Sequence, residues 1–472
     1  MDYDYDLLIL GGGSAGYAAA RTGHELGLKT VVVDGAETLG GLCILRGCMP
    51  SKTLIESGNR MLSARRASEF GIHTSAPTAN VSAIRDRKRS LIGEFAEYRQ
   101  NQLADGRFDL IRARGAFSDA HTLKLDDGEN SSLTFATAVV ATGSKVTTAP
   151  IPGLAESGYL VSDDILEAAS LPESLIVLGG GAIALELTHY LEAIGRRVSI
   201  IQRSPRFLKE LDHDLSPVVE DAFRGRGIDV YTGTSISNVT STEDGKKQVS
   251  FQHGEKGVIV TADEIVYALG RRATTDGLGL DEVGVILRKN GQIESDHTLA
   301  TSAPNIFAAG DVTGPHEIVH VAIEQGEAAA INAAVLLGKL PPEKKRSVSY
   351  RLKLFGVFCE PQVATVGLSE QEAAAKGMDF ATASYPFDDH GKSMVMGETH
   401  GFVKMITDKS TGEIIGASVV GPEAADLIHE VVVAMHFKAT AQDFLTIPHY
   451  HPTLSEIWTY PAEELALTNE LK

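Results

Sequence analysis

The sequence predicts an α/β protein built on parallel sheets, because one strand–turn–helix–strand unit occurs twice in its 472 residues. In the first copy, the apolar run DLLILG at 6–11 precedes a glycine turn, an Ala-rich helical stretch and the run KTVVVD at 29–34. In the second copy, apolar runs at 175–178 and 197–202 flank the stretch GGGAIALELTHYLEAIG. Two strands that are joined by a helix in this way lie parallel in one sheet.

The rest of the chain alternates helical and strand-like segments. We expect helices near 51–70 and 81–103, strands near 110–125 and 133–140, and a further strand that ends near Ala309. Two prolines and a charge run predict a linker at 339–350, beyond which strands and helices alternate. At about 150 residues per domain, the length predicts about three domains.

Composition and charge exclude several classes of function. With 43 basic and 62 acidic residues, the formal net charge is −19, which argues against a general nucleic-acid surface. No apolar run approaches the roughly 20 residues of a membrane helix, and MDYDYDLLILGGG fits a first strand rather than a signal peptide. Three cysteines in a chain of this length do not build a disulfide framework, so we expect a reducing, cytoplasmic setting.

The first glycine turn has the spacing of a dinucleotide-binding loop. Gly11, Gly13 and Gly16 occupy the glycine positions of G-x-G-x-x-G. Glycine is needed there for the tight turn, for close approach to a pyrophosphate and for packing of helix on strand. Asp34 lies 23 residues after Gly11, where its carboxylate can accept hydrogen bonds from ribose hydroxyls. An ordinary glycine-rich turn would explain one such match, but a second copy favours dinucleotide binding.

The second copy follows the pattern G-x-G-x-x-A and differs at the ribose position. Gly179, Gly181 and Ala184 fit the loop. The residue 23 positions after Gly179 is Gln202 rather than an acid. It is followed by the cations Arg203, Arg206 and Lys209. Loss of the carboxylate and gain of cations favour the 2′-phosphate of NADP over NAD, with solvated surface charges as the alternative.

Two cysteines, Cys43 and Cys48, lie five positions apart in the run GGLCILRGCMPSK. A zinc site normally needs four ligands, but Cys359 is the only other cysteine and no histidine is close in sequence. Pro50 suits the first turn of a helix, which would place Cys48 at a helix N-terminus where the dipole stabilises a thiolate. We interpret the pair as a redox disulfide, with two unreactive buried thiols as the alternative. For Cys359 a small buried thiol is the expectation.

A series of motifs spans nearly the whole chain. They are the first glycine fingerprint, the G-G-x-C-x4-C-x-P-S-K run, VVATGS around Gly143, the second glycine fingerprint, ALGRR at 268–272, IFAAGD ending at Asp311, and HPTLSE at 451–456. In this order they resemble the FAD-dependent pyridine nucleotide–disulfide oxidoreductases, the group that includes glutathione reductase, dihydrolipoyl dehydrogenase and mercuric reductase. The resemblance implies two Rossmann-like dinucleotide-binding domains, for FAD and NAD(P), and a C-terminal α+β dimerisation domain.

The resemblance also implies cofactor contacts. For FAD they are Gly11, Gly13, Gly16, Asp34, Gly115, Gly143 and Asp311, with Lys52 near the flavin N5 and paired with Glu186. For the nicotinamide nucleotide they are Gly179, Gly181, Ala184, Arg203, Lys209 and Gly270. Without the resemblance, Lys52 would be taken as a surface cation and Glu186 as a plain helix residue.

The catalytic roles that the resemblance implies involve both ends of the chain. Cys48 would lie against the flavin and Cys43 would face the substrate. His451 would be the acid–base residue, oriented by Glu456, and it would act in the partner subunit's active site, so the enzyme would be an obligate homodimer. From the residues alone, His451 fits a turn, and Thr453 and Glu456 match a T-x-x-E capping box.

The expected domains are FAD-binding at 1–148, NAD(P)-binding at 149–271, central at 272–343 and interface at 344–472. The expected substrate is a small disulfide or dithiol, with dihydrolipoamide first and glutathione disulfide as the NADPH-dependent alternative. A flavoprotein redox sensor with little turnover is a third reading. Two departures from the family lie beside the cysteines, where Leu42 replaces the usual Thr and Arg46 occupies the loop between them. Arg46 could depress a thiol pKa, attract an anionic substrate or point to solvent.

Overall fold

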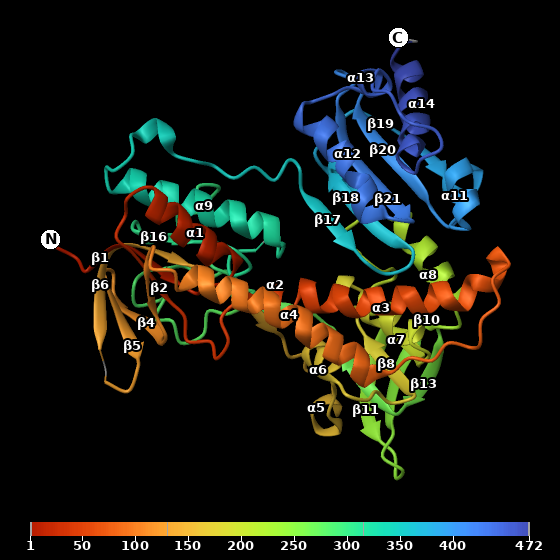
Figure 1. Cartoon of the computed structure of the whole chain (residues 1–472), viewed down its shortest axis with the longest axis horizontal. Helices are drawn as coiled ribbons and strands as arrows, with labels where there is room; N and C mark the ends of the chain where they lie inside the picture. The colour runs from red at the N-terminus through yellow and green to blue at the C-terminus, as the bar shows by residue number, and fades with distance from the viewer. Residues whose placement is uncertain (1, 130, 315, 471–472) are drawn as a thin grey trace. The chain divides into compact units, whose positions relative to one another are not determined.

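The structure, a computed structural model, describes residues 2–129, 131–314 and 316–470 and divides into two compact units. Unit 1 contains the residues up to Ser51, Arg85–Thr148 and Gly270–Ser349. Unit 2 contains Lys52–Ile84, Ala149–Leu269 and the residues from Tyr350 onward. Figure 1 shows that segments from three separate parts of the chain make up each unit.

Unit 1 is built on a seven-stranded sheet in the order β3-β2-β1-β6-β5-β4, with β16 paired to β6. The strands are β1 Tyr5–Leu10, β2 Thr30–Val33, β3 Asp109–Ile111, β4 Arg114–Asp119, β5 Thr122–Asp126, β6 Ser132–Val140 and β16 Ile306–Ala308. The pairs β1–β2, β1–β6, β2–β3 and β6–β16 are parallel. The central strands are buried on both faces. Helices α1 Ser14–Glu25 and α9 Val319–Leu336 pack against each other on one face, and apolar side chains of β4, β5 and residues 273–312 cover the other.

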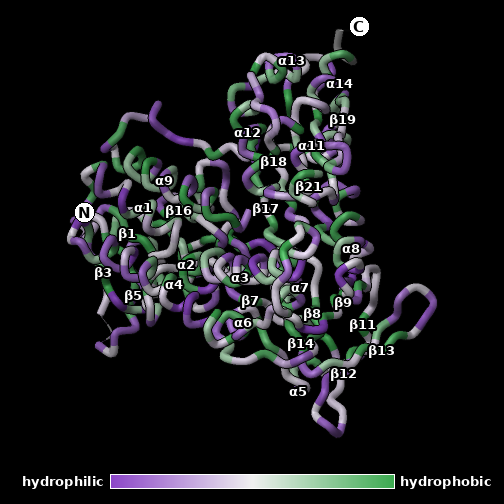
Figure 2. The backbone as a smooth tube through the Cα atoms, turned by 45° about the vertical axis from the view of Figure 1, so that its right-hand side comes forward, coloured by the Kyte–Doolittle hydropathy of each residue, from purple (hydrophilic) through white to green (hydrophobic). Residues whose placement is uncertain are grey.

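Unit 2 contains the second parallel sheet, in the order β10-β9-β8-β14. Its strands are β8 Ser174–Leu178, β9 Arg197–Ile201, β10 Asp229–Tyr231 and β14 Glu264–Tyr267, with α7 Ala182–Ala193 and α8 Leu215–Gly225 between them. Figure 2 shows β8, β9 and β14 as largely hydrophobic, in keeping with their burial. An antiparallel sheet of β11 Thr234–Ser241, β12 Lys247–His253 and β13 Lys256–Ala262 follows. The repeat expected from the sequence is therefore confirmed, because β8, α7 and β9 repeat the order of β1, α1 and β2.

The C-terminal part of unit 2 is an antiparallel sheet in the order β17-β18-β21-β20-β19. Its strands are β17 Leu354–Val357, β18 Gln362–Gly367, β19 Phe380–Pro386, β20 Phe402–Asp408 and β21 Ile414–Gly421. Its helices are α10 Glu370–Ala375, α11 Gly391–Met396, α12 Ala424–His436, α13 Ala441–Leu445 and α14 Thr459–Glu470, with 3-10 turns η3 Phe387–Asp389 and η4 Ser455–Trp458. Trp458 is fully buried in the core between sheet and helices and donates to the carbonyl of Leu427 at 3.1 Å.

The predicted helices near 51–70 and 81–103 are present as α3 Cys48–Arg66 with the turn η1 Ala67–Phe70, and as α4 Val81–Leu103. The remaining short elements are α2 Gly41–Leu45, β7 Ser144–Val146, α5 Leu154–Ser157, α6 Ser162–Glu167 and β15 Arg271–Ala273. The predicted linker contains only the turn η2 Pro342–Lys344. Among the residues that the structure describes, no helix combines the length and apolar character needed to cross a bilayer.

Candidate active site

The first glycine loop, in unit 1, connects β1 to α1 in a conformation that only glycine tolerates. Gly11 has φ +105°, and a Cβ there would lie 2.5 Å from the carbonyl oxygen of Ala141. A Cβ on Gly16 would collide with the carbonyl oxygen of Gly11. Both collisions are with backbone, so a larger residue would push α1 away from the sheet. Gly13 is the N-cap of α1 and offers no side chain to its first N–H groups.

Asp34 directly follows β2 beside this loop, at the end of the strand as predicted. Its Oδ2 accepts the Gly12 N–H at 2.7 Å, and its Oδ1 accepts the Ala36 N–H at 2.8 Å. The two bonds hold the carboxylate in place, and each oxygen keeps a lone pair for a further donor. An uncapped helix N-terminus next to a fixed carboxylate fits a dinucleotide, because the N–H groups suit a pyrophosphate and the carboxylate suits a ribose. The chain's own geometry therefore fits FAD at this loop.

The second loop, in unit 2, repeats this geometry with two differences. Gly179 has φ +129°, and a Cβ there would collide with the carbonyl oxygen of Ala268. The helix position occupied by Gly16 in the first loop is Ala184 here, fully buried, so this loop leaves room for one methyl group. Gly181 is the uncapped N-cap of α7. The side chain of Gln202 packs over Gly180, where a carboxylate binds the loop in unit 1.

The three cations predicted to bind a 2′-phosphate differ in whether their side chains already have a partner. Arg203 is exposed, and among the described residues its side chain has no carboxylate partner. Lys209 pairs with Glu210 at 3.2 Å, and Arg206 contacts His213 Nε2 at 2.6 Å. Arg203 is therefore the cation best placed to receive an added anion, and Lys209 is already partly neutralised.

The cysteine run in unit 1 folds into the short helix α2 and the first turn of the long helix α3. Cys43 lies half-buried in α2, and Cys48 is exposed at the first residue of α3, as predicted from Pro50. Gly41 has φ +74°, and a Cβ there would lie 2.6 Å from the Cα of Gly13, so this run packs against the first glycine loop. The helix N-terminus favours the thiolate form of a cysteine that lies there.

In unit 2, Lys52 and Glu186 form the ion pair that the resemblance implied. Lys52 Nζ lies 2.7 and 2.9 Å from the two carboxylate oxygens, although the residues are far apart in sequence. The Phe358 N–H donates to Glu186 Oε1 at 3.1 Å, and the ammonium lies 4.5 Å from the centroid of the Phe358 ring. The side chain of Glu186 is 6% exposed and that of Lys52 is 32% exposed, so a buried carboxylate orients an ammonium group that is still partly solvated.

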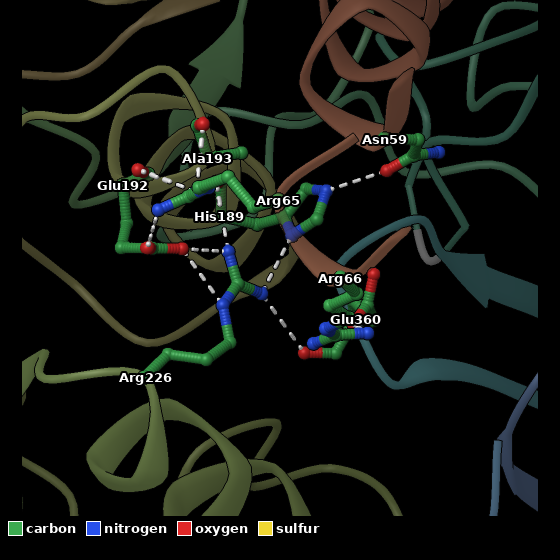
Figure 3. Close-up of polar contacts among 8 residues, drawn as sticks. All are labelled: Asn59, Arg65, Arg66, His189, Glu192, Ala193, Arg226 and Glu360. Atoms are coloured by element: carbon green, nitrogen blue, oxygen red, sulfur yellow. Dashed lines mark hydrogen bonds and ion pairs between the residues drawn. The ribbon is translucent and has the colours of Figure 1, made fainter. Parts of the chain in front are cut away.

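Figure 3 shows further polar contacts between residues of α3 and α7. His189 Nε2 lies 2.8 Å from Asn59 Oδ1, and Arg65 donates to Glu192 and to the carbonyl of Ala193. Arg226 binds Glu192 from the other side, donates to His189 Nδ1 at 2.9 Å and reaches the carbonyl of Glu360. Burial first, and the guanidinium of Arg226 second, lower the pKa of His189 well below its usual value. The imidazole is therefore neutral, with its proton on Nε2.

Two histidines near the C-terminus each bind a glutamate, but only one keeps a nitrogen available. His449 is 7% exposed, with Nε2 2.6 Å from Glu430 Oε1 and Nδ1 2.9 Å from the carbonyl of Ile447. His451 is 78% exposed, and its Nδ1 lies 3.0 and 2.9 Å from the two oxygens of the buried Glu456. Among the described residues Nε2 of His451 meets no partner, so this histidine can exchange a proton.

The capping box considered for Thr453 and Glu456 does not form. The Glu456 N–H reaches Thr453 Oγ1 at 3.4 Å, but the glutamate side chain turns to His451 instead of back to Thr453. The turn η4 has Leu454 as its N-cap without a side-chain cap. The Glu456 carboxylate therefore binds His451 and does not cap the turn.

The other residues expected to contact a cofactor lie in unit 1, where hydrogen bonds, backbone conformation or packing define their surroundings. Asp311 accepts a hydrogen bond from Ser144 Oγ at 2.7 Å, and Arg271 donates to the same hydroxyl at 2.9 Å. Gly143 and Gly270 adopt φ +70° and +117°, and a Cβ on Gly115 would lie 2.5 Å from Leu123 Cδ2. Gly115 is thus explained by packing alone, whereas Gly143 faces open space.

Sequence reasoning missed Arg99, which lies on α4. Its guanidinium stacks 4.1 Å from the centroid of the Tyr17 ring on α1. Burial lowers the pKa of Arg99, and the nearby Tyr17 and Cys43 oppose that shift, which places a cation near one of the two paired cysteines. No local motif marks an arginine within a charged helix, so this proximity could not be read from the sequence.

Cys359 is buried, as expected, and its Sγ lies 3.1 Å from the carbonyl oxygen of Pro361. Burial, aided by Glu186, raises the pKa of this thiol far above its usual range, so it is unreactive. Across the described residues, no group of three or more histidines, cysteines or acidic residues is arranged to hold a metal ion.

Comparison with known proteins identifies the family. Residues 5–326 match the model of the pyridine nucleotide–disulphide oxidoreductases, and residues 355–462 match the dimerisation domain of the same family. The chain belongs to this family. It is therefore an FAD-dependent pyridine nucleotide–disulfide oxidoreductase, as the order of motifs predicted.

Individual relatives carry several names. The chain is 34% identical to a dihydrolipoyl dehydrogenase of Bacillus subtilis, with 97% of each chain covered. It is 33% identical to a mercuric reductase of Staphylococcus aureus, covering 94% of this chain and 79% of the relative. Among solved structures, it resembles the HOCl-induced flavoprotein disulfide reductase RclA from Escherichia coli, in a Cu(II) complex. The TM-score is 0.85 and the identity 26%, with 98% of this chain and 100% of the other covered.

Proposed function

We propose that this enzyme transfers electrons between a pyridine nucleotide and a small disulfide or dithiol through Cys43 and Cys48. The observation that carries the proposal is the placement of Cys48 at the first residue of α3, with Cys43 in the helical segment just before it. This placement favours the thiolate form of Cys48, and Cys43, five residues earlier in the chain, supplies the second sulfur that reversible disulfide chemistry requires.

The residues that would hold FAD are the first glycine loop, Asp34 and Asp311. The N–H groups at the start of α1 would bind the pyrophosphate, and Asp34 the ribose. Bound FAD supplies a two-electron carrier between the nicotinamide and the cysteine pair. The resemblance implies that Lys52 acts near the flavin N5, and Glu186 would fix the orientation of its ammonium group. We assign 1–148 to FAD binding, 149–271 to NAD(P) binding, 272–343 to the central domain and 344–472 to the interface.

The thiol chemistry follows from the cysteine pair in its dithiol form. Cys43, which the resemblance places toward the substrate, attacks one sulfur of the substrate disulfide once its proton has passed to His451, so a mixed disulfide forms and one substrate thiolate leaves. Cys48 then attacks Cys43, which releases the second substrate thiol and leaves the Cys43–Cys48 disulfide. In total, one substrate disulfide and the enzyme dithiol become two thiols and the enzyme disulfide. Substrate reduction therefore balances oxidation of the pair, and a dithiol substrate would reverse these steps.

His451 would move the proton that these steps need. The leaving thiolate must be protonated, and an imidazole whose Nδ1 is held by Glu456 presents Nε2 for that transfer. We propose that the histidine acts in the active site of a partner subunit of a homodimer. In support, the dimerisation domain carries exposed large apolar side chains, namely Val433, Phe437, Ile447 and Tyr450. Such side chains are expected at an interface.

We propose NADP(H) as the preferred nucleotide, on the basis of Arg203. A bond from this guanidinium to the 2′-phosphate would be worth about 1.5–3 kcal/mol, so Arg203→Ala should lower the NADPH-to-NADH ratio of kcat/KM by about 10-fold or more. Lys209→Ala is the matched control, since Lys209 is already paired with Glu210 and should change the ratio less. A parental enzyme that prefers NADH would contradict the assignment.

The substrate is proposed to be a lipoyl group, with glutathione disulfide as the alternative. Similarity to dihydrolipoyl dehydrogenases supports the first, whereas the NADP preference and the cations Arg46 and Arg99 near the cysteines favour an anionic disulfide. Turnover with lipoamide, glutathione disulfide and neutral disulfides, each with NADPH and NADH, separates these choices. Absence of steady turnover with every disulfide would support a redox sensor instead.

The cysteine roles are tested by Cys43→Ser and Cys48→Ser. Each variant should lose disulfide turnover by at least about 10³-fold while it still passes electrons from NADPH to ferricyanide, which needs no sulfur. Cys359→Ala controls for loss of a thiol elsewhere and should retain turnover. Parental disulfide turnover in either serine variant would refute the mechanism.

A further inference from the structure

A second histidine lies against the carboxylate that orients His451. His390 is fully buried between η3 and α11, and its Nε2 lies 3.5 Å from Glu456 Oε1. Among the described residues, this Nε2 makes no hydrogen bond, and the contact with Glu456 at 3.5 Å is an ion-pair distance. A buried polar nitrogen that points at a buried carboxylate is costly unless the two interact.

The tautomer of His390 follows from its other nitrogen. Nδ1 lies 2.8 Å from the hydroxyl oxygen of Ser393, which is also fully buried. If Nδ1 carried the proton, the lone pair of Nε2 would face the negative carboxylate of Glu456. The favourable arrangement has Ser393 donating to Nδ1, which leaves the N–H on Nε2 directed at Glu456. Burial lowers the pKa of His390, opposed by Glu456, so the ring is a neutral donor.

The surroundings of His390 contain few other ionisable groups. Glu456 and His451 face it from the segment around η4, and the ring of Tyr460 on α14 meets it edge-on, with the centroids 6.4 Å apart. Tyr460 stacks on Tyr385 of β19, whose hydroxyl donates to Asp389 at 2.9 Å. Glu456 is therefore the only carboxylate that contacts this imidazole within the part of the chain that the structure describes.

We propose that His390 is a positioning residue that holds the Glu456 carboxylate in the orientation in which it binds His451. Its Nε2–H faces Oε1, while both carboxylate oxygens engage Nδ1 of His451. Four groups are thus connected in sequence, from the buried Ser393 through His390 and Glu456 to the exposed imidazole of His451. Holding the carboxylate keeps His451 in the tautomer that leaves its Nε2 able to exchange the proton of the thiol reaction. The inference rests on the proposed acid–base role of His451.

The test replaces His390 by Phe, which removes the donor, and by Asn, whose amide can still donate. A general acid–base group contributes about 10²–10⁴-fold, so loss of its positioning should lower disulfide turnover of His390→Phe by about 10-fold. The pH profile of that turnover should also shift, and His390→Asn should recover most of the loss. Electron transfer from NADPH to ferricyanide should stay at the parental rate in both variants, because it needs no proton at sulfur.

Two outcomes would overturn the inference. One is parental disulfide turnover and an unchanged pH profile in His390→Phe. The other is an equal fall of disulfide and ferricyanide activity in both variants, which would indicate a merely structural residue. His451→Gln separates this inference from the proposed function, because parental turnover in that variant would refute the acid–base role itself. If His451→Gln is slow, adding His390→Phe to it should cause no further loss.

Discussion

The buried imidazole of His189 predicts that the contact between α3 and α7 weakens in mild acid. Its Nδ1 accepts from Arg226 and its Nε2 donates to Asn59, so a second proton would place an N–H against a guanidinium. Arg65 and Arg66 add positive charge around the same ring. The folded state therefore holds His189 neutral at pH values where the unfolded chain protonates it.

The sign and size of the effect follow from proton linkage. The pKa of His189 in the folded state lies well below the ordinary value of 6.5, so the unfolded state binds the extra proton first as the pH falls. Stability is thus complete above pH 6.5 and declines below it. One such proton costs about 1.4 kcal/mol per pH unit, so lowering the pH from about 7.5 to 5.5 should remove about 1.4 kcal/mol in total.

The assay is hydrogen–deuterium exchange of peptides that cover α7, in the parent and in His189→Gln, at both pH values. Glutamine can donate to Asn59 without titrating in this range, so it removes only the pH-dependent contribution. After correction for intrinsic exchange rates, the opening free energy of the parent should fall by about 1.4 kcal/mol more than that of the variant. Equal declines in the two proteins would refute the reasoning.

Two further predictions concern stability. Gly179→Ala should lower the free energy of unfolding by about 2 kcal/mol or more, because the new Cβ meets a carbonyl oxygen at a left-handed φ. Gly181→Ala, whose Cβ would meet no described atom within 4 Å, should unfold with the parent in the same thermal scan. Lys404 is 4% exposed and binds Asp212, Asp214 and Glu370. Lys404→Met should lower the free energy of unfolding, measured with urea, by about 3–5 kcal/mol, because it leaves the buried carboxylate of Asp212 unpaired. Lys409→Met, in an exposed pair, should cost less than about 1 kcal/mol, and equal losses for the two lysines would contradict the argument.

Local patterns in the sequence were enough to determine both dinucleotide loops and the start of α3. The steric demand at Gly11 and Gly179 arises where a strand turns into a helix, so it recurs at fixed spacing and can be recognised without a structure. The same holds for Asp34, which ends the next strand, and for Cys48, whose helical position follows from Pro50 two residues later.

Contacts between distant segments were decided only by the tertiary structure. His449 and His451 look equivalent in sequence, and only packing shows that the first has both nitrogens occupied while the second keeps Nε2 available. His390 and Arg99 belong to no motif, yet folding brings one to Glu456 and the other to Tyr17. Spacing along a chain records which side chains share a turn or a face. The partner of a side chain across a core depends on how whole sheets and helices pack, and no local pattern carries that information.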